Sequence, residues 1–71
     1  MSVQQQVHEE MSHFAQAKRN FPHRLFRMIF ANTRQHVLGK RATMQLSFAE
    51  TVAYATEYVR REYPDFEPVW A

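Results

Sequence analysis

The stretch from Phe21 to Gly39 constrains the fold of this chain more than any other segment. With successive residues about 100° apart on a helical wheel, its apolar and charged side chains separate onto opposite faces. The inward face carries Leu25, Phe26, Ile29, Phe30, Thr33 and Val37, and the outward face carries Arg24, Arg27, Arg34 and Gln35. We therefore expect one amphipathic helix over residues 21–38.

Local signals at both ends support this helix. Asn20 can cap its start, and Pro22 suits a first turn because that turn needs no N–H from it. Gly39, the only glycine of the chain, stands where a helix often ends in a left-handed residue. Lys40 and Arg41 follow, and their charges would favour the negative end of the helix dipole. The sequence predicts that the helix stops at this glycine.

A second helix is predicted before it and a third after it. Apolar residues spaced by four, four and three, at Val3, Val7, Met11 and Phe14, predict a helix over residues 3–18. Residues 40–46 are expected to form a loop. Ser47 and Glu50 then match a capping box, which predicts a helix over residues 48–63 that Pro64 ends.

The length of 71 residues and the absence of cysteine decide how such helices must be held together. A domain of this size buries only about 60% of its unfolded surface, and no disulfide can supplement its core. We expect a single all-α domain of three helices over residues 1–71, with homodimerisation as a possible source of added stability. The predicted core is Val7, Met11, Phe14, Leu25, Phe26, Ile29, Phe30, Val37, Leu46, Phe48, Val52, Ala55, Val59 and Trp70.

The tail from residue 64 to residue 71, PDFEPVWA, is acidic, aromatic and interrupted by two prolines, so it cannot continue a helix. One interpretation is that Phe66, Val69 and Trp70 fold back over the open side of the helices, since exposed large aromatics are a liability. The other is a short linear motif that docks in a groove of another protein.

Charge is distributed unevenly along the chain. The formal charge is −2 over residues 1–17, +7 over residues 18–41 and −3 over residues 42–71. The cations of the middle segment form a predicted basic ridge: Lys18, Arg19, Arg24, Arg27, Arg34, Lys40 and Arg41. Three interpretations stay open, namely a solvated face paired with acids, a site for an acidic protein, and a site for nucleic acid phosphates. Base readout would be poor, because few amide or hydroxyl side chains lie between the arginines.

Residue patterns for catalysis or metal binding are weak. His8 and His13 are five residues apart, whereas two zinc ligands on one helical face need a spacing of four. Glu10 and His13 have the spacing of a carboxylate-bridged metal site, but no matching pair is evident. No cysteine nucleophile and no glycine-rich phosphate loop are present. We expect a protein that is not an enzyme and that uses no metal or cofactor.

Two segments carry a resemblance to known proteins, namely the opening MSVQQQ and the run KRNFPHRLFRMIF over residues 18–30. In size and style the chain resembles the small accessory proteins of lambdoid phages and prophages, in particular those encoded between the exonuclease and excisionase genes. The resemblance implies a helical protein that contacts host or phage factors and influences the choice between lysis and lysogeny.

Taken together, these features predict an interaction module in the cytoplasm, with no membrane span or signal peptide. Its expected partner is a host or phage protein, and nucleic acid is the alternative. Arginine and aromatic side chains anchor many interfaces. The candidate partner-binding residues are Lys18, Arg19, Arg24, Arg27, Arg34, Lys40, Arg41, Tyr54, Tyr58, Phe66 and Trp70.

Overall fold

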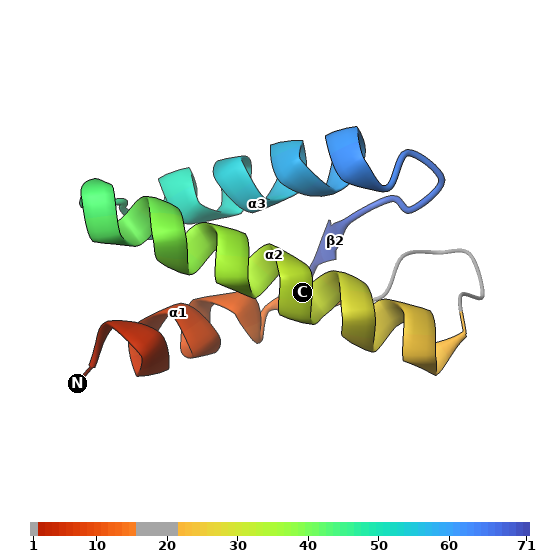
Figure 1. The fold of residues 1–71 in the computed structure, drawn as a ribbon, viewed down its shortest axis with the longest axis horizontal. Helices are drawn as coiled ribbons and strands as arrows, with labels where there is room; N and C mark the ends of the chain where they lie inside the picture. Colours follow the sequence, from red (N-terminus) through yellow and green to blue (C-terminus); the bar gives the residue numbers. More distant parts are fainter. Residues whose placement is uncertain (1, 16–21) are drawn as a thin grey trace.

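The structure is a computed structural model that describes residues 2–15 and 22–71. Within these residues the chain forms three helices and one short antiparallel strand pair, which confirms the predicted all-α class. The elements are α1 (Val3–Met11), β1 (Phe14–Ala15), α2 (His23–Thr43), α3 (Phe48–Glu62) and β2 (Val69–Trp70) (Figure 1). The expected cap at Asn20 lies outside the described residues.

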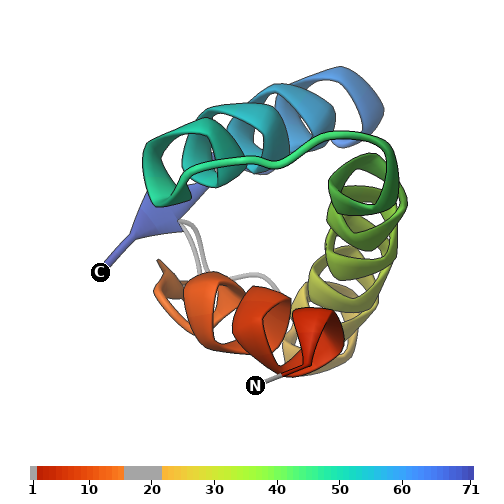
Figure 2. The same cartoon turned by 90° about the vertical axis from the view of Figure 1, so that its left-hand side faces the viewer.

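The longest helix, α2, organises the other elements. Viewed from the end, α1 and α3 lie on two sides of α2, and β2 lies on the side away from α2 (Figure 2). Both shorter helices pack on α2, and they also touch each other. The apolar side chains of all three helices therefore meet in one core.

The first helix is shorter than predicted, because α1 ends at Met11 and not at residue 18. Ser2 caps it, and its hydroxyl accepts the N–H of Gln5. After Met11 the chain turns, and Phe14 pairs with Trp70 in an antiparallel register. The N–H of Ala71 also donates to the carbonyl of His13. Pairing with a distant strand thus overrides a helical spacing that the local sequence would also permit.

The second helix is longer than predicted, and the expected stop at Gly39 is wrong. Gly39 has no positive φ angle and lies inside α2, which continues to Thr43. Glycine costs a helix about 1 kcal/mol relative to alanine. Contacts on either side of it offset this cost, since Leu38 packs on the core and Arg41 joins α1. The predicted loop over residues 40–46 is therefore helical up to residue 43.

The third helix begins as its capping box predicts. The Ser47 hydroxyl accepts the N–H of Glu50 at 3.2 Å, and the Glu50 carboxylate accepts the N–H of Ser47 at 3.1 Å. This reciprocal pair satisfies two N–H groups that no helical carbonyl can reach. The helix ends at Glu62, one residue earlier than predicted and two before Pro64.

Most of the predicted core is confirmed. The buried apolar residues are Val7, Met11, Phe14, Ile29, Val37, Ala55, Val59 and Phe66, and predicted residues Leu25, Phe26, Phe30 and Trp70 pack against them half-buried. Leu46 and Val52 are also half-buried. Phe48 is a wrong prediction, because its side chain is 48% exposed. It is the first residue of α3, and its ring forms a T-shaped contact with His13.

Two threonines take core positions that an apolar pattern does not reveal. Thr33 and Thr51 are fully buried, and each hydroxyl donates to the carbonyl four residues earlier in the chain. Buried hydroxyls are tolerated when they are hydrogen-bonded in this way. Thr51 therefore joins Ala55 and Val59 on the inner face of α3.

The C-terminal tail packs on the core, which confirms the first of its two interpretations. The Phe66 ring is 2% exposed and stacks on Phe14 and Phe26, with centroid distances of 5.9 and 6.2 Å. The Trp70 ring meets Phe14 edge-on, and its Nε1–H donates to the hydroxyl of Thr56 at 2.9 Å. These contacts bury Phe66 and orient the indole.

Candidate functional site

The structure divides the predicted basic ridge into residues with different environments. Lys18 and Arg19 lie outside the described residues. Arg24 and Arg27 are exposed, and Arg34 is half-buried. Lys40 is also half-buried, with its Nζ 5.3 Å from the ring centroid of Tyr54. Within the described residues, the fully exposed cations of the ridge are therefore Arg24 and Arg27.

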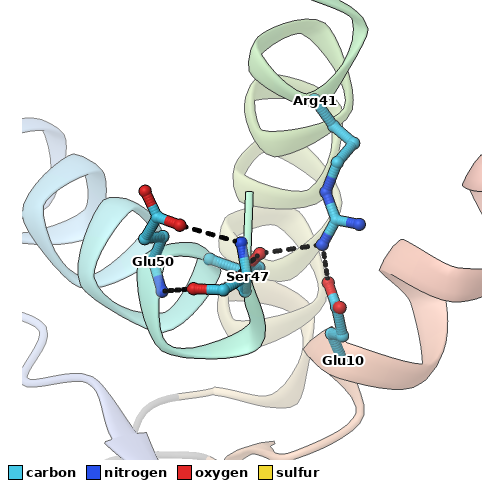
Figure 3. Close-up of polar contacts among 5 residues, drawn as sticks. Glu10, Arg41, Ser47 and Glu50 are labelled. Atoms are coloured by element: carbon cyan, nitrogen blue, oxygen red, sulfur yellow. Dashed lines mark hydrogen bonds and ion pairs between the residues drawn. The ribbon is translucent and has the colours of Figure 1, made fainter. Parts of the chain in front are cut away.

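Arg41 does not belong to this exposed surface. Its side chain is 8% exposed and crosses from α2 to α1, where Nη2 donates to the Glu10 carboxylate (Figure 3). The same nitrogen donates to the Thr51 hydroxyl of α3 at 3.0 Å. Its buried Nε has no hydrogen-bond partner within the described part of the chain. Arg41 thus ties three helices together, and its predicted role in partner contact is replaced by a structural one.

Glu10 is correspondingly part of the fold. Its side chain is only 13% exposed, beside Arg41. A buried ion pair needs further hydrogen bonds to balance the loss of hydration, and Thr51 supplies one of them. Among residues 2–15 and 22–71, no three histidine or acidic side chains gather where they could hold a metal ion.

A groove of about 580 Å³ lies between α1 and α2. Its lining is mostly apolar and aromatic, with polar side chains from both helices. The residues that line it are His8, Ser12, Phe14, Phe26, Arg27, Phe30, Ala31 and Arg34. The groove is open to solvent, so a segment of another molecule can reach its floor.

The side chains that line the groove come from α1, from the segment that follows it and from α2. Phe26 and Phe30 project from α2 next to Phe14, with centroid distances to Phe14 of 6.1 and 6.4 Å. His8 forms the wall on α1, and its ring meets Phe30 edge-on at 6.4 Å. Because Phe14 also stacks on the tail, the floor of the groove is supported from beneath by Phe66. The apolar floor therefore rests on the core.

The two arginines of the groove are free of ion pairs within the described part of the chain. The ion pairs formed among the described residues are Arg41 with Glu10 and Arg61 with Glu62, so neither Arg27 nor Arg34 takes part in one. Among residues 2–15 and 22–71, no acidic side chain lines the groove. The site thus combines an apolar floor with two cations that have no carboxylate partner in this part of the molecule.

A second aromatic surface lies between α2 and α3. The His36 ring stacks on Tyr54 and Tyr58, with centroid distances of 5.1 and 4.3 Å. Burial raises the pKa of Tyr58, with smaller contributions in the same direction from Tyr63 and Glu62. Both candidate tyrosines are half-buried, and their rings are engaged within the molecule. They offer less free surface than the sequence suggested.

The aromatic residues of the tail offer little contact surface as well. Phe66 is buried, and Trp70 is half-buried with its indole N–H already donated to Thr56. Phe66 can reach a partner only if the tail first leaves the core, whereas Trp70 keeps part of its side chain exposed. Among the candidate surfaces of the described residues, the groove combines an open apolar floor with two arginines that take part in no ion pair there.

Sequence reasoning found the arginines but missed the groove. His8, Ser12 and Phe14 belong to a segment well before α2, and their place beside Arg27 depends on the packing of α1. One local signal was present, since Ala31 is a small residue between Arg27 and Arg34 on the same face of α2. A small residue between two large cations leaves room for an incoming side chain.

Comparison with protein-family models, curated proteins and solved structures gives no match. The geometry of the groove is therefore the basis for assigning a function. Across residues 2–15 and 22–71, no helix has the length and apolar character that crossing a membrane requires.

Proposed function

We propose that this protein is a non-enzymatic interaction module that binds an acidic segment of another protein in the groove between α1 and α2. The observation that carries the proposal is the pairing of an aromatic floor with Arg27 and Arg34, which have no ion-pair partner among the described residues. An acidic partner would supply the missing carboxylates, and its apolar side chains would cover the phenylalanine rings.

The composition of the groove favours protein over nucleic acid. A phosphate backbone is bound mainly by cations and polar donors, and it does not require an apolar floor. Here the floor consists of Phe14, Phe26 and Phe30, and the cations of the described residues that line it are Arg27 and Arg34. Phe26 and Phe30 are half-buried, so a partner that covers them would remove apolar area from water.

A module of this kind acts by occupying a surface of its partner. This mode of action suits a small regulatory protein in the cytoplasm of a host cell, as the resemblance to phage accessory proteins implies. Electrostatic attraction to an acidic partner would speed association and make it sensitive to salt, whereas the apolar floor would prolong the complex.

The test is partner capture from host lysate by the full chain and by charge-reversal variants. Arg27→Glu with Arg34→Glu should abolish capture. Arg60→Glu is a matched control, since Arg60 is exposed on α3 and also takes no part in an ion pair among the described residues. Equal capture by the groove variant and by the wild type would contradict the proposal.

The nucleic acid alternative is tested in parallel. A mobility-shift assay with duplex and single-stranded DNA at two salt concentrations should show no retention that depends on Arg27 and Arg34. Retention that falls steeply with salt and disappears in the groove variant would replace the proposed function with nucleic acid binding.

A further inference from the structure

The rim of the groove also specifies the shape of what binds there. Resting on the proposed function, we propose that the occupant is an amphipathic helix with two carboxylates seven residues apart and an apolar residue between them. The inference follows from the spacing of Arg27, Ala31 and Arg34 along α2.

Arg27 and Arg34 are seven residues apart on one helix, which is close to two turns. At about 1.5 Å of rise per residue, their Cα atoms are separated by roughly 10.5 Å along the axis. Both residues line the same groove, so the two cations border it from positions about two helical turns apart. An occupant must present two carboxylates with a similar separation on one face.

A helix meets this requirement better than an extended segment does. Residues i and i+7 of a helix share one face at a separation of roughly 10.5 Å. In a strand, residues on one face recur every second position, at roughly 6.8 or 13.6 Å, and neither value matches. Two helices that pack side by side can keep their facing side chains opposite each other over two turns. A helical occupant can therefore contact Arg27 and Arg34 with both of its acids at the same time.

The middle of the groove fits the same pattern. Phe30 and Ala31 lie halfway between the two arginines, where residue i+3 or i+4 of a bound helix would point. Ala31 is small, and the volume of about 580 Å³ lies within the range of about 300–1,000 Å³ typical of ligand pockets. A leucine or phenylalanine side chain of the occupant would contact Phe26 and Phe30 there.

Bound in this way, the occupant adds one helix to the outer side of the α1 and α2 pair. The face of the occupant that contacts the groove would then present an acid, an apolar residue and a second acid. This order is complementary to the order Arg27, Ala31, Arg34 of α2. This helix-in-groove mode places anchors at i, i+3 or i+4 and i+7.

The experiment uses three synthetic peptides and the full-length protein. The first peptide is helical, with glutamates at i and i+7 and leucine at i+4. The second has the same composition and helicity but has its glutamates at i and i+5, which lie on different faces. The third repeats the first with a proline on its solvent face to break the helix. Affinities are measured by calorimetry, and helicity of the peptides is checked by circular dichroism.

The first peptide should bind roughly tenfold more tightly than either of the others. Arg27→Glu and Arg34→Glu should each weaken it by roughly tenfold, while Arg60→Glu should leave it within about twofold. Arg27→Gln and Arg34→Gln serve as milder variants if either reversal perturbs the fold. Equal binding of the three peptides would overturn the inference of a helical occupant.

Other outcomes separate this inference from the proposed function. If no peptide binds, but lysate capture still requires Arg27 and Arg34, the helical occupant is wrong and the acidic partner stands. If neither capture nor peptide binding depends on these arginines, both proposals fail. A dimer seen by sedimentation without peptide, and dissociated by the two reversals, would show that a second copy fills the groove and would overturn the inference.

Discussion

Arg41 of α2 donates to Glu10 of α1, joining residues that are 31 positions apart in the chain. Both side chains are largely buried, and Thr51 of α3 accepts a second hydrogen bond from the same guanidinium nitrogen. One arginine thus connects all three helices (Figure 3).

Removing one partner of the ion pair between Arg41 and Glu10 should destabilise the fold. Arg41→Ala leaves the Glu10 carboxylate buried without its cation, so the free energy of unfolding should fall by about 3 kcal/mol. Chemical denaturation measures this loss. Replacing both partners, as Glu10→Leu with Arg41→Met, should bring stability back to within about 1.5 kcal/mol of the wild type. If the single variant is as stable as the double variant, the pair is not a buried link between helices.

Gly39 provides a test of the continuous α2 helix. A β-carbon added at this position meets no atom within 4 Å, and the φ angle of Gly39 is not positive. Gly39→Ala should therefore raise the free energy of unfolding by about 0.5–1 kcal/mol, because alanine favours the helix and restricts the unfolded chain. Ala42→Gly, an exposed site on the same helix, should have the opposite effect. Destabilisation by Gly39→Ala would indicate a helix stop at this residue.

The capping box of α3 should contribute a pH-dependent part of stability. Hydrogen bonds from the backbone and side chain of Ser47 lower the pKa of Glu50 from its usual 4.5. Because the folded pKa is the lower one, this contribution is present above the unfolded pKa and is lost as pH falls through the folded pKa.

Glu50→Gln does not titrate, so its thermal midpoint should fall less than that of the wild type between pH 7 and about pH 3. Glu57→Gln, an exposed glutamate of the same helix, is the control and should behave like the wild type. Ser47→Ala should cost about 1 kcal/mol at neutral pH. Identical acid sensitivity in Glu50→Gln and the wild type would argue against the charged cap.

The tail should stabilise the domain through Phe66. Phe66→Ala removes a ring that stacks on Phe14 and Phe26, and it should lower the free energy of unfolding by about 3 kcal/mol or more. Phe48→Ala is the matched control, since that ring is 48% exposed and should cost about 1 kcal/mol or less. Equal effects of the two substitutions in urea denaturation would mean that the tail does not pack on the core.

Several elements follow from the sequence because their signals are local. The capping box at Ser47 and Glu50, the cap at Ser2 and the opposite faces of α2 each depend on residues within one or two helical turns. Such short-range interactions act in the same way wherever the helix is placed. The all-α class and most of the core residues could therefore be predicted, whereas the sequence left two interpretations of the tail open.

Only the tertiary structure determined the features that depend on contacts between residues far apart in the chain. Phe14 is extended because Trp70 pairs with it, although its spacing from Met11 suits a helix equally well. Arg41 is buried because Glu10 and Thr51 meet it, and Arg27 and Arg34 line a groove because α1 brings His8 beside them. Local propensity differs by less than about 1 kcal/mol between such alternatives, so long-range contacts select among them.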